Sequence, residues 1–321
     1  MSRYARQMQL PEIGEAGQSR LGKAHVAVVG AGGLGCPVLQ YLVGAGIEKI
    51  SIFDPDEVEE SNLHRQPLYG MPDIGKPKAL AARDALRALN PQVEVSANVE
   101  SIGPTRAPEI AANADLVIDA ADSFAASYIL SDACLAEDTP LVSASVLGQT
   151  GYVGGFCGGA PSLRAVFPEL PATGATCATA GVLGPVVGVI GALQAQIAIK
   201  VLLGAQPALG QMITADLSGM HFGGFSFLGN PEPETAIPFI AEPMLQCSDL
   251  IIELRSHHEA PKKIRPEAER ISEAELRNQF PFSRQRVVLC CQSGLRAWRA
   301  AKGLQAQGET NLALLAARAS K

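Results

Sequence analysis

The chain has 321 residues, more than one hydrophobic core usually fills, so we expect either two domains or one large domain with an appendage. Hydrophobic residues make up 47% of it and charged residues 18%, which is typical of a folded protein and excludes extensive disorder. The formal net charge of -6 supplies no basic field for a phosphate backbone, so we expect no nucleic-acid partner.

Charge and proline content divide the chain into two parts. Residues 248–321 carry 13 basic and 8 acidic side chains, a net charge of +5, whereas the residues before them are strongly acidic. Four prolines lie between residues 231 and 243, and proline disfavours helix interiors and central strands. We therefore predict a first domain over residues 1–228, a Pro-rich linker over 229–246 and a short second domain over 247–321.

A glycine-rich turn near the N-terminus predicts a nucleotide site. Residues 25–29 are rich in valine, as in a buried strand, and the residues after 36 are typical of a helix. The glycines between them are Gly30, Gly32, Gly33 and Gly35. In such a turn the backbone can approach a phosphate, whose charge is stabilised by free N–H groups and the helix dipole.

The next predicted strand, residues 48–53, ends at a carboxylate. Asp54 follows it, 19 residues after Gly35, where an acidic residue can bind the hydroxyl pair of a ribose. A nicotinamide-dependent oxidoreductase would have the same features. Up to this point the pattern therefore indicates only a nucleotide.

Polar and basic residues beyond this strand favour ATP. They provide an amide, a guanidinium and an ammonium, a set suited to a triphosphate and of no evident use to a nicotinamide enzyme. The candidates are Ser61, Asn62, Leu63, His64, Arg65, Gln66 and Lys78.

A second carboxylate follows the predicted strand at residues 114–119. Asp122 and Ser123 come just past its carboxyl end, where ligands bind in open α/β sheets, so Asp122 is a candidate ligand for Mg²⁺. The alternative is that Asp122 caps the N-terminus of the helix that follows. The two roles can coexist.

Five motifs in order carry a resemblance to a known family. They lie at residues 3–7, 10–18, 30–35, 61–66 and 181–191. Together they resemble the ubiquitin-activating-enzyme-like adenylyltransferases of molybdopterin and thiamine biosynthesis, over about residues 3–228. The resemblance implies a doubly wound, mostly parallel Rossmann-like sheet and a homodimer. It also implies ATP-dependent adenylation of the C-terminal Gly-Gly carboxylate of a small ubiquitin-like sulfur-carrier protein.

The resemblance also implies roles for single residues. Gly33 and its neighbours would hold ATP, Asp54 the ribose, and Asn62, Arg65 and Lys78 the phosphates, with Mg²⁺ on Asp122. Arg6 would reach into the site of the partner subunit.

Two departures from the family pattern stand out. Two cysteine pairs that relatives use for zinc are absent, so we expect no structural zinc and a loop from residue 156 to 175 that is held by packing. Ser127 replaces an arginine of the Asp122 segment, which leaves a non-catalytic carrier-binding scaffold as an alternative.

The cysteine content indicates a cytoplasmic protein. There are seven cysteines, with no CxxC motif, and the N-terminus is polar, so we expect neither a secreted disulfide framework nor a signal peptide. The uncharged residues 181–199 contain a proline and two glutamines, which favours a buried helix, so we expect no membrane partner. Cys177 matches a cysteine that forms a covalent link in some relatives, and buried filler is the alternative. We expect Cys36, Cys134 and Cys157 to be structural.

The second domain contains a candidate sulfur-carrying loop. Residues 286–290 predict a strand and residues 297–305 a helix, and the loop between them is Cys291, Gln292, Ser293, Gly294, Leu295 and Arg296. Backbone N–H groups, a helix N-terminus and Arg296 all favour a thiolate on Cys291, whereas Cys290 faces the other side of the strand. The loop resembles the persulfide cradle of rhodanese sulfurtransferases, with residues 250–255 as their opening strand and Glu259 as its acidic partner.

Joined in one chain, the two parts predict two steps. The first makes an acyl-adenylate on the carrier, and a persulfide on Cys291, loaded by a donor such as a cysteine desulfurase, then attacks it toward a thiocarboxylate. We therefore expect an adenylyltransferase with sulfurtransferase activity.

Overall fold

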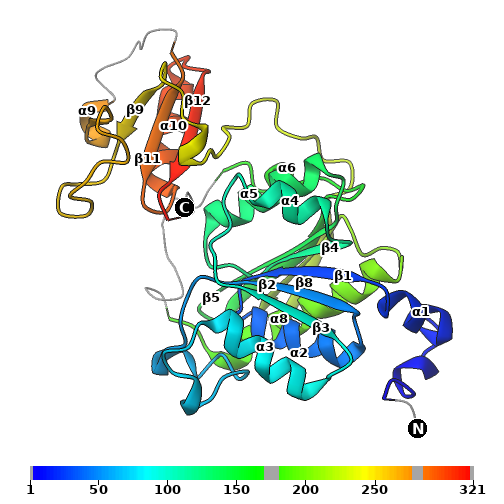
Figure 1. Ribbon diagram of the computed structural model, residues 1–321. Coiled ribbons are helices and arrows are strands. Elements are labelled where there is room, and N and C mark those ends of the chain that lie inside the picture. Colours follow the sequence, from blue (N-terminus) through cyan, green and yellow to red (C-terminus); the bar gives the residue numbers. More distant parts are fainter. Residues whose placement is uncertain (1–2, 170–180, 277–284, 319–321) are drawn as a thin grey trace.

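The structure is a computed structural model that describes residues 3–169, 181–276 and 285–318 (Figure 1). A large sheet with helices on both faces forms the N-terminal unit, and a smaller sheet with two helices forms the C-terminal unit. This confirms the predicted fold class of a doubly wound α/β unit followed by a smaller α/β unit. Cys177 lies outside the described residues.

The large sheet has eight strands in the order β3-β2-β1-β4-β5-β6-β7-β8. The strands are β1 (His25–Val29), β2 (Lys49–Phe53), β3 (Glu94–Asn98), β4 (Leu116–Asp119), β5 (Leu141–Leu147), β6 (Thr150–Phe156), β7 (Gln211–Asp216) and β8 (His221–Ser226). From β3 to β5 all neighbours pair in parallel, and β6 to β8 add on antiparallel. The order reverses between β1 and β4, which is where open α/β sheets bind ligands.

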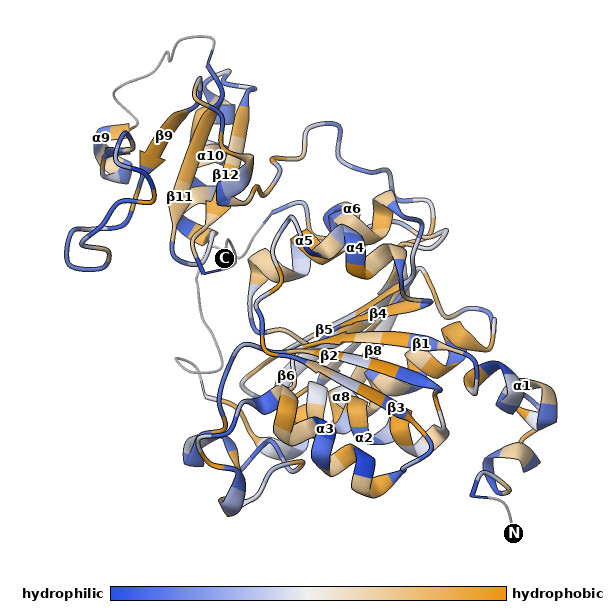
Figure 2. Ribbon diagram, in the orientation of Figure 1, coloured by the Kyte–Doolittle hydropathy of each residue, from blue (hydrophilic) through white to orange (hydrophobic). Residues whose placement is uncertain are grey.

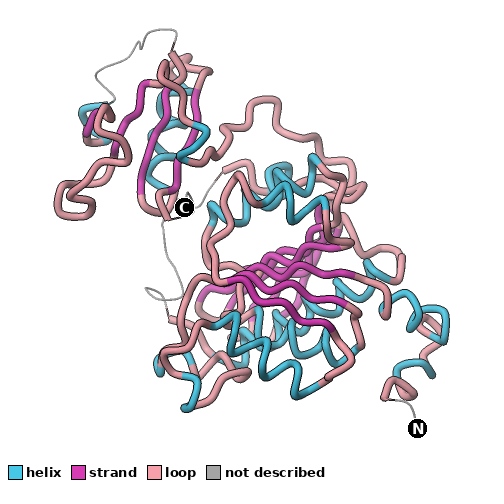
Figure 3. The backbone as a smooth tube through the Cα atoms, viewed as in Figure 1, coloured by secondary structure: helices cyan, strands magenta, loops and turns pink. Residues whose placement is uncertain are grey.

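Helices cover both faces of this sheet, as Figure 1 shows. One face carries α4 (Ala107–Ala112), α5 (Phe124–Ala136) and α6 (Leu163–Val166), and the other α2 (Gly35–Ala45), α3 (Lys78–Leu89) and α8 (Gly184–Leu202). The N-terminal helix α1 (Gly14–Leu21) precedes β1, and short 3-10 helices lie at η1 (Gln7–Gln9), η2 (Glu60–Asn62), η3 (Met71–Asp73) and η4 (Glu242–Met244). Loops join these elements in Figure 3.

Alternation along β1 explains why the sheet needs both layers. Val26 and Val28 belong to the hydrophobic core under α2 and α8, whereas Ala27 and Val29 belong to the core under α5. Successive side chains of a strand point to opposite faces, so an unbroken apolar strand must be covered on both sides. Figure 2 shows the resulting hydrophobic strands.

Helix α8 is long and apolar enough to span a membrane by length and composition, the one such helix in the part of the chain that is described. It packs against β4, β5 and β6 of the sheet. At its centre the buried Gln194 side chain donates to the carbonyl oxygens of Asp119 (2.7 Å) and Val142 (3.1 Å). The helix is thus joined to the sheet by polar as well as apolar contacts.

The C-terminal unit is a parallel sheet in the order β10-β9-β11-β12. Its elements are β9 (Leu250–Glu253), β10 (Glu269–Arg270), α9 (Glu273–Leu276), β11 (Val287–Cys291), α10 (Leu295–Ala306) and β12 (Leu312–Ala316). The strand and helix predicted around Cys291 are both present. β9 is the first strand of this sheet in chain order, as predicted, and ahead of it Phe239 forms an isolated parallel bridge with Leu314 of β12. Part of the predicted linker therefore joins this sheet, while the domain boundaries themselves stay a prediction.

The two sheets direct their carboxyl edges toward each other. Past the end of β11, a Cβ atom placed on Gly294 would lie 3.3 Å from the Cβ of Ala125, which begins α5. Past the end of β12, Arg318 forms an ion pair with Asp56, which follows β2. Lys302 of α10 adds an ion pair with Glu169 at 2.8 Å. The loops that follow the strands of both units are therefore neighbours.

Candidate functional site

The glycine turn packs so tightly at the end of β4 that there is no room for a side chain at Gly30 or Gly35. A Cβ atom on Gly30, whose φ is 98°, would lie 2.4 Å from the carbonyl oxygen of Ala120. A Cβ atom on Gly35 would lie 2.0 Å from the carbonyl oxygen of Gly30. Since α2 begins at Gly35, the turn delivers the N-terminus of that helix to the carboxyl edge of the sheet.

The residues predicted to bind phosphates lie against this turn. Gly33 faces the side chain and carbonyl oxygen of Arg65, and a Cβ atom on Gly32 would lie 3.7 Å from Gln66 Nε2. Gln66 is 3% exposed, and its Oε1 has no hydrogen-bond partner within the described ranges. A buried acceptor beside a glycine cradle fits a polar ligand that donates a hydrogen bond, as a nucleotide does.

Asp54 is held at the end of β2 with its carboxylate facing the turn. Oδ2 accepts the Ala31 N–H (2.7 Å) and Oδ1 accepts the Asp56 N–H (2.8 Å). Burial raises the pKa of the Asp54 carboxyl, and these N–H groups and the nearby Lys78 ammonium offset part of that effect. Each oxygen keeps a free lone pair, so the pair of acceptors suits ribose hydroxyls.

Lys78 and Arg65 place two cations at the site, Lys78 near Asp54 and Arg65 beside Gly33. Lys78 begins α3, is 7% exposed and lies with Nζ 3.2 Å from Oδ2 of Asp56. Arg65 is partly exposed, and its Nη1 donates to the Ser61 carbonyl oxygen (3.1 Å) and to His64 Nε2 (2.8 Å). Lys78 is thus pre-positioned by a carboxylate that the sequence analysis missed, although Asp56 stands only two residues after Asp54.

The remaining predicted residues of this motif shape the loop. Asn62 is buried, and its Oδ1 accepts the Glu59 N–H (3.3 Å) while Ser61 donates to the Glu59 carboxylate (3.0 Å). Leu63 packs against the core beneath. These contacts fold η2 so that Arg65 projects over the glycines; whether Asn62 also touches phosphate stays a prediction.

Asp122 lies exposed between β4 and α5. Ser123, not Asp122, is the N-cap residue of α5, so the capping alternative for Asp122 was wrong. No hydrogen bond or ion pair to the Asp122 carboxylate occurs among the described residues, which leaves its oxygens available to a cation. Beneath it the fully buried Asp119, also missed from sequence, accepts from Ser143 Oγ (2.7 Å) and the Ala121 N–H (3.2 Å). Asp119 anchors the loop that carries Asp122.

Arg6 does not lie at the glycine turn of its own chain. Its neighbour Gln7 donates to the carbonyl oxygen of Ala45 (2.9 Å), and the Tyr4 ring faces Gly46. Both contacts are at the C-terminal end of the 11-residue helix α2. The glycine turn is at the other end of α2, about 16 Å away at about 1.5 Å per residue.

The Cys291 loop has the geometry expected of a thiolate cradle. Cys291 Sγ accepts the N–H groups of Gly294 (3.2 Å) and Ala297 (3.3 Å) at the start of α10. Arg296 forms an ion pair with the predicted partner Glu259 and also donates to the Leu254 carbonyl oxygen (3.2 Å). Gln292 and Ser293 complete the turn.

Four further cysteines, Cys36, Cys134, Cys157 and Cys290, have structural surroundings, whereas Cys247 is exposed. Cys290 packs in a separate cluster on the opposite face of β11 from Cys291, as predicted. Burial raises the pKa of the Cys36 and Cys157 thiols to about 12, and that of Cys134 further. These thiols are protonated and enclosed at neutral pH.

The loop after β6 is held by an ion pair and not by packing alone. Arg164 makes two hydrogen bonds to the Asp132 carboxylate (2.6 and 2.8 Å), and its guanidinium lies 5.0 Å from the ring centre of Tyr128. Ser162 donates through N–H (2.7 Å) and Oγ (2.5 Å) to Glu232. In the described part of the chain no cluster of three metal-binding side chains occurs.

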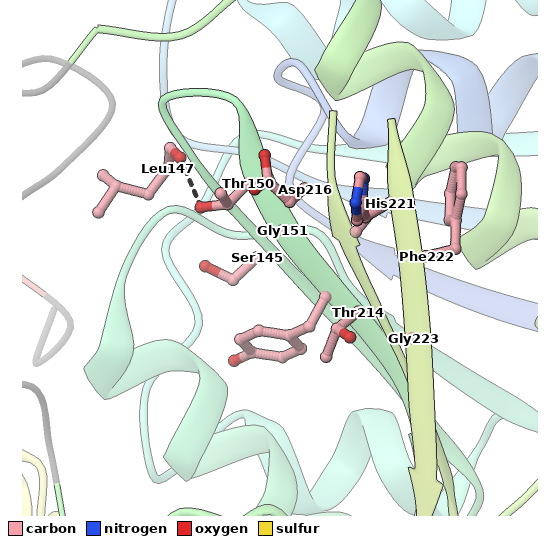
Figure 4. Close-up of a pocket in the computed structure, with 11 residues that line it drawn as sticks. Ser145, Leu147, Thr150, Gly151, Thr214, Asp216, His221, Phe222 and Gly223 are labelled. Atoms are coloured by element: carbon pink, nitrogen blue, oxygen red, sulfur yellow. Dashed lines mark hydrogen bonds between the residues drawn. The ribbon is translucent and has the colours of Figure 1, made fainter. Parts of the chain in front are cut away.

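An open hollow of about 510 Å³ lies on the antiparallel side of the sheet, shown in Figure 4. Ser145 and Leu147 of β5, Thr150 of β6 and Thr214 of β7 line it, with Phe222 of β8 at its rim. It begins at the carboxyl end of β5, next to the strand that carries Asp119.

The edge strand β8 beside this hollow is exposed along its whole length. Its region displays four large apolar side chains, each at least half exposed: Met220, Phe222, Phe225 and Leu228. Phe222 and Phe225 are three residues apart in this strand and point to opposite faces of the sheet, so each face has one exposed aromatic side chain at this edge.

Comparisons with known proteins agree with this geometry. A Thermus thermophilus protein named sulfur carrier protein adenylyltransferase is 44% identical over 240 residues, covering 72% of this chain and 89% of its own. The Aspergillus niger adenylyltransferase and sulfurtransferase uba4 is 45% identical over 211 residues, covering 62% of this chain and 44% of its own. This chain therefore matches less than half of that fused relative.

Among solved structures, Escherichia coli MccB with ATP has the same fold, with a TM-score of 0.62, 24% identity and coverage of 72% of this chain and 73% of its own. The ThiF family model matches residues 4–235, which contain the glycine turn, Asp54, Arg65, Lys78 and Asp122. The chain belongs to the ThiF family.

Proposed function

We propose that this protein uses ATP to adenylate the C-terminal carboxylate of a small ubiquitin-like sulfur-carrier protein. The observation that carries the proposal is the convergence at one sheet edge of the glycine cradle with Asp54, Gln66 and Lys78, beside an open hollow. A relative with 44% identity bears the name sulfur carrier protein adenylyltransferase, which supports the same activity.

The nucleotide would lie across the glycine turn. Its phosphates would face the N-terminus of α2 and the cations of Arg65 and Lys78, and its ribose would face Asp54. Gln66 Oε1 would accept from the ligand, which relieves the cost of an unpaired buried oxygen.

The carrier would dock on β8 and pass its terminus along the hollow toward the nucleotide. Apart from Asp216 and His221 the hollow is lined by uncharged residues, several of them small, which suits a narrow Gly-Gly terminus. Exposed Phe222, which lines the hollow, offers apolar contact to the body of a small protein. This docking explains why a site for a small nucleotide lies beside a surface suited to a protein.

The reaction needs charge compensation and no general base. The ionised carboxylate attacks the α-phosphorus, pyrophosphate leaves with the bonding electrons, and Lys78 and Arg65 stabilise the charge of the transition state. Mg²⁺, which the free Asp122 carboxylate would help to hold, would supply further positive charge to the phosphates when bound. Arg6 of a partner subunit would add another cation in a homodimer, since Arg6 of the same chain lies at the other end of α2.

The C-terminal unit would complete the conversion. A terminal persulfide sulfur on Cys291 attacks the acyl carbon, AMP leaves, and an acyl disulfide joins the carrier to Cys291. A second thiol then reduces the disulfide, which releases the carrier thiocarboxylate and forms a new disulfide with Cys291. Cys177 is a candidate for that thiol, and a cysteine desulfurase in the cytoplasm is the candidate sulfur donor.

ATP–pyrophosphate exchange with a panel of Gly-Gly-ended carriers tests the proposal. Exchange that depends on one carrier and disappears in Lys78→Ala supports it. Carrier binding without exchange would instead indicate a scaffold. Binding of a reduced nicotinamide cofactor in place of ATP would indicate an oxidoreductase.

A further inference from the structure

One carboxylate at the nucleotide site lies between cations from both units. Asp56 Oδ2 is 3.2 Å from Nζ of Lys78, and its Oδ1 is 3.4 Å from Nη2 of Arg318, 262 residues away in the sequence. The backbone of Asp56 belongs to the same site, since its N–H donates to Asp54 Oδ1 and its carbonyl oxygen accepts the Lys78 N–H (2.8 Å for each). Arg318 therefore touches a group that is itself part of the site.

The backbone of Arg318 is tied to the cysteine loop. Its N–H donates to the carbonyl oxygen of Gln292 (3.1 Å), and the preceding Ala317 N–H donates to the carbonyl oxygen of Cys291 (2.9 Å). A continuous set of polar contacts thus runs from Lys78 through Asp56 and Arg318 to the residues around Cys291. Along the covalent chain, by contrast, the path between Asp56 and Arg318 runs through the whole linker and the C-terminal sheet.

We infer that Arg318 is a positioning residue of the nucleotide site, supplied by the C-terminal unit, and that it couples ATP binding to the placement of the Cys291 loop. The inference rests on the proposed function, because ATP is the ligand. When a triphosphate attracts the Lys78 ammonium, the Asp56 carboxylate is left beside added negative charge. Arg318 offsets that charge, so its contact stabilises the ATP-bound state more than the free state.

The coupling is reciprocal. If docking of the C-terminal unit strengthens ATP binding, ATP must strengthen docking by the same factor. A second contact places this coupling close to the reacting groups. Gly294 of the cysteine loop faces Ala125, which stands three residues after Asp122. ATP would therefore hold the sulfur-carrying loop at the edge where the acyl-adenylate forms.

Calorimetric titration with Mg-ATP, in the absence of carrier, measures the first half of the inference. We expect Arg318→Ala to weaken binding by about threefold, the size of an exposed charge pair, and the difference to shrink at high salt. In an Asp56→Asn background the same substitution has little further effect. Arg83→Ala, which removes a partly exposed cation paired with Asp84 on α3, is the control and leaves ATP affinity unchanged.

Hydrogen exchange tests whether ATP holds the Cys291 loop in place, and it does so without measuring turnover. ATP should slow amide exchange of peptides covering residues 291–298 and 312–318 in the wild type and in Arg83→Ala, but not in Arg318→Ala at saturating ATP. Equal affinity and equal protection in wild type and Arg318→Ala would overturn the inference while leaving the proposed function intact. Failure of the wild type to bind ATP would overturn the proposed function itself. Arg318 is largely exposed, so the variant folds, and the fluorescence of the buried Trp298 verifies this.

Discussion

Arg164 binds the carboxylate of Asp132 through both Nε and Nη2, at 2.6 and 2.8 Å, and so ties the segment after β6 to α5. The Arg164 side chain is 9% exposed and also donates to the carbonyl oxygen of Ile237 (3.3 Å). It therefore joins α5, the loop after β6 and the segment that leads to the C-terminal sheet. In this chain a planar, bidentate ion pair with two hydrogen bonds joins segments that a metal site could otherwise join.

Arg164→Ala should therefore destabilise the N-terminal unit. Removing one partner of a largely buried pair leaves Asp132 without its cation, and we expect a loss of about 2 to 3 kcal/mol, below the range for a fully buried pair because Asp132 is partly exposed. Chemical denaturation followed by circular dichroism measures it. Arg83→Ala serves as the control, and a variant as stable as the wild type would contradict a structural role for the pair.

The local parts of the site were predictable from sequence, since they depend on residues close together in the chain. The strand, glycine turn and helix around Gly33 follow from apolar periodicity and the glycine spacing. The opposite orientations of Cys290 and Cys291 follow from the alternation of a strand.

The parts that were not predictable depend on contacts between distant segments. Asp56 gains its importance from Lys78 and from Arg318, which is 262 residues away, and no periodic pattern relates such positions. Phe239 likewise stands among prolines that favour a linker, yet it forms an isolated parallel bridge with Leu314 that ties it to the C-terminal sheet. Long-range pairing overrode the local composition.

The C-terminal unit should lose stability in acid. Burial raises the pKa of the Asp249 and Glu253 carboxyls, but hydrogen bonds from Arg286 and Arg255 lower it more, so both lie below their usual values of 3.8 and 4.5. A carboxyl whose pKa is lower in the folded than in the unfolded state makes its full contribution to folding stability above the unfolded-state pKa. That contribution is lost as the pH falls through the folded-state pKa. The decline should therefore begin below about pH 4.5, on the linkage of these two groups.

Trp298 in α10 is the single tryptophan of the chain, so its fluorescence reports this unit alone. Asp249→Asn should lower the denaturation midpoint at pH 7 and make it less dependent on pH between 5 and 3. Glu267→Gln, at an exposed carboxylate, should change neither. If the denaturation midpoint of Asp249→Asn depends on pH as that of the wild type does, Asp249 does not contribute to the loss of stability in acid.

Cys291→Ser should separate the two proposed activities. The hydroxyl of the introduced serine cannot carry sulfane sulfur. We therefore expect sulfur transfer from thiosulfate to cyanide and thiocarboxylation of the carrier to disappear. ATP–pyrophosphate exchange should persist, because the glycine cradle does not use this thiol. Cys247→Ser, at an exposed cysteine, should retain both activities. Sulfurtransfer that survives in Cys291→Ser would show that another thiol carries the sulfur.

The exposed side chain of Phe222 should contribute to carrier docking. Because it is 57% exposed, Phe222→Ser should leave stability unchanged, whereas loss of an aromatic contact should raise the KM for the carrier about tenfold. The KM for ATP should stay the same. Leu89→Ser, at a comparably exposed apolar residue of α3, is the control. A carrier KM equal to that of the wild type would place the docking surface elsewhere.

Arg6 and Lys78 should act in the same site from different subunits. Arg6 precedes Gln7, which is held at the C-terminal end of α2, and Lys78 lies at the opposite, carboxyl edge of the sheet, so each intact site in a homodimer would combine Lys78 of one chain with Arg6 of the other. Arg6→Ala and Lys78→Ala should each lack ATP–pyrophosphate exchange as homodimers. Mixing the two after subunit exchange should restore about a quarter of wild-type activity, since half the dimers are mixed and each mixed dimer has one complete site. An Arg6→Ala/Lys78→Ala double variant mixed with wild type controls for simple dilution, because its mixed dimers contain no complete site. If the two single variants stay inactive on mixing although subunits have exchanged, Arg6 does not act across the dimer.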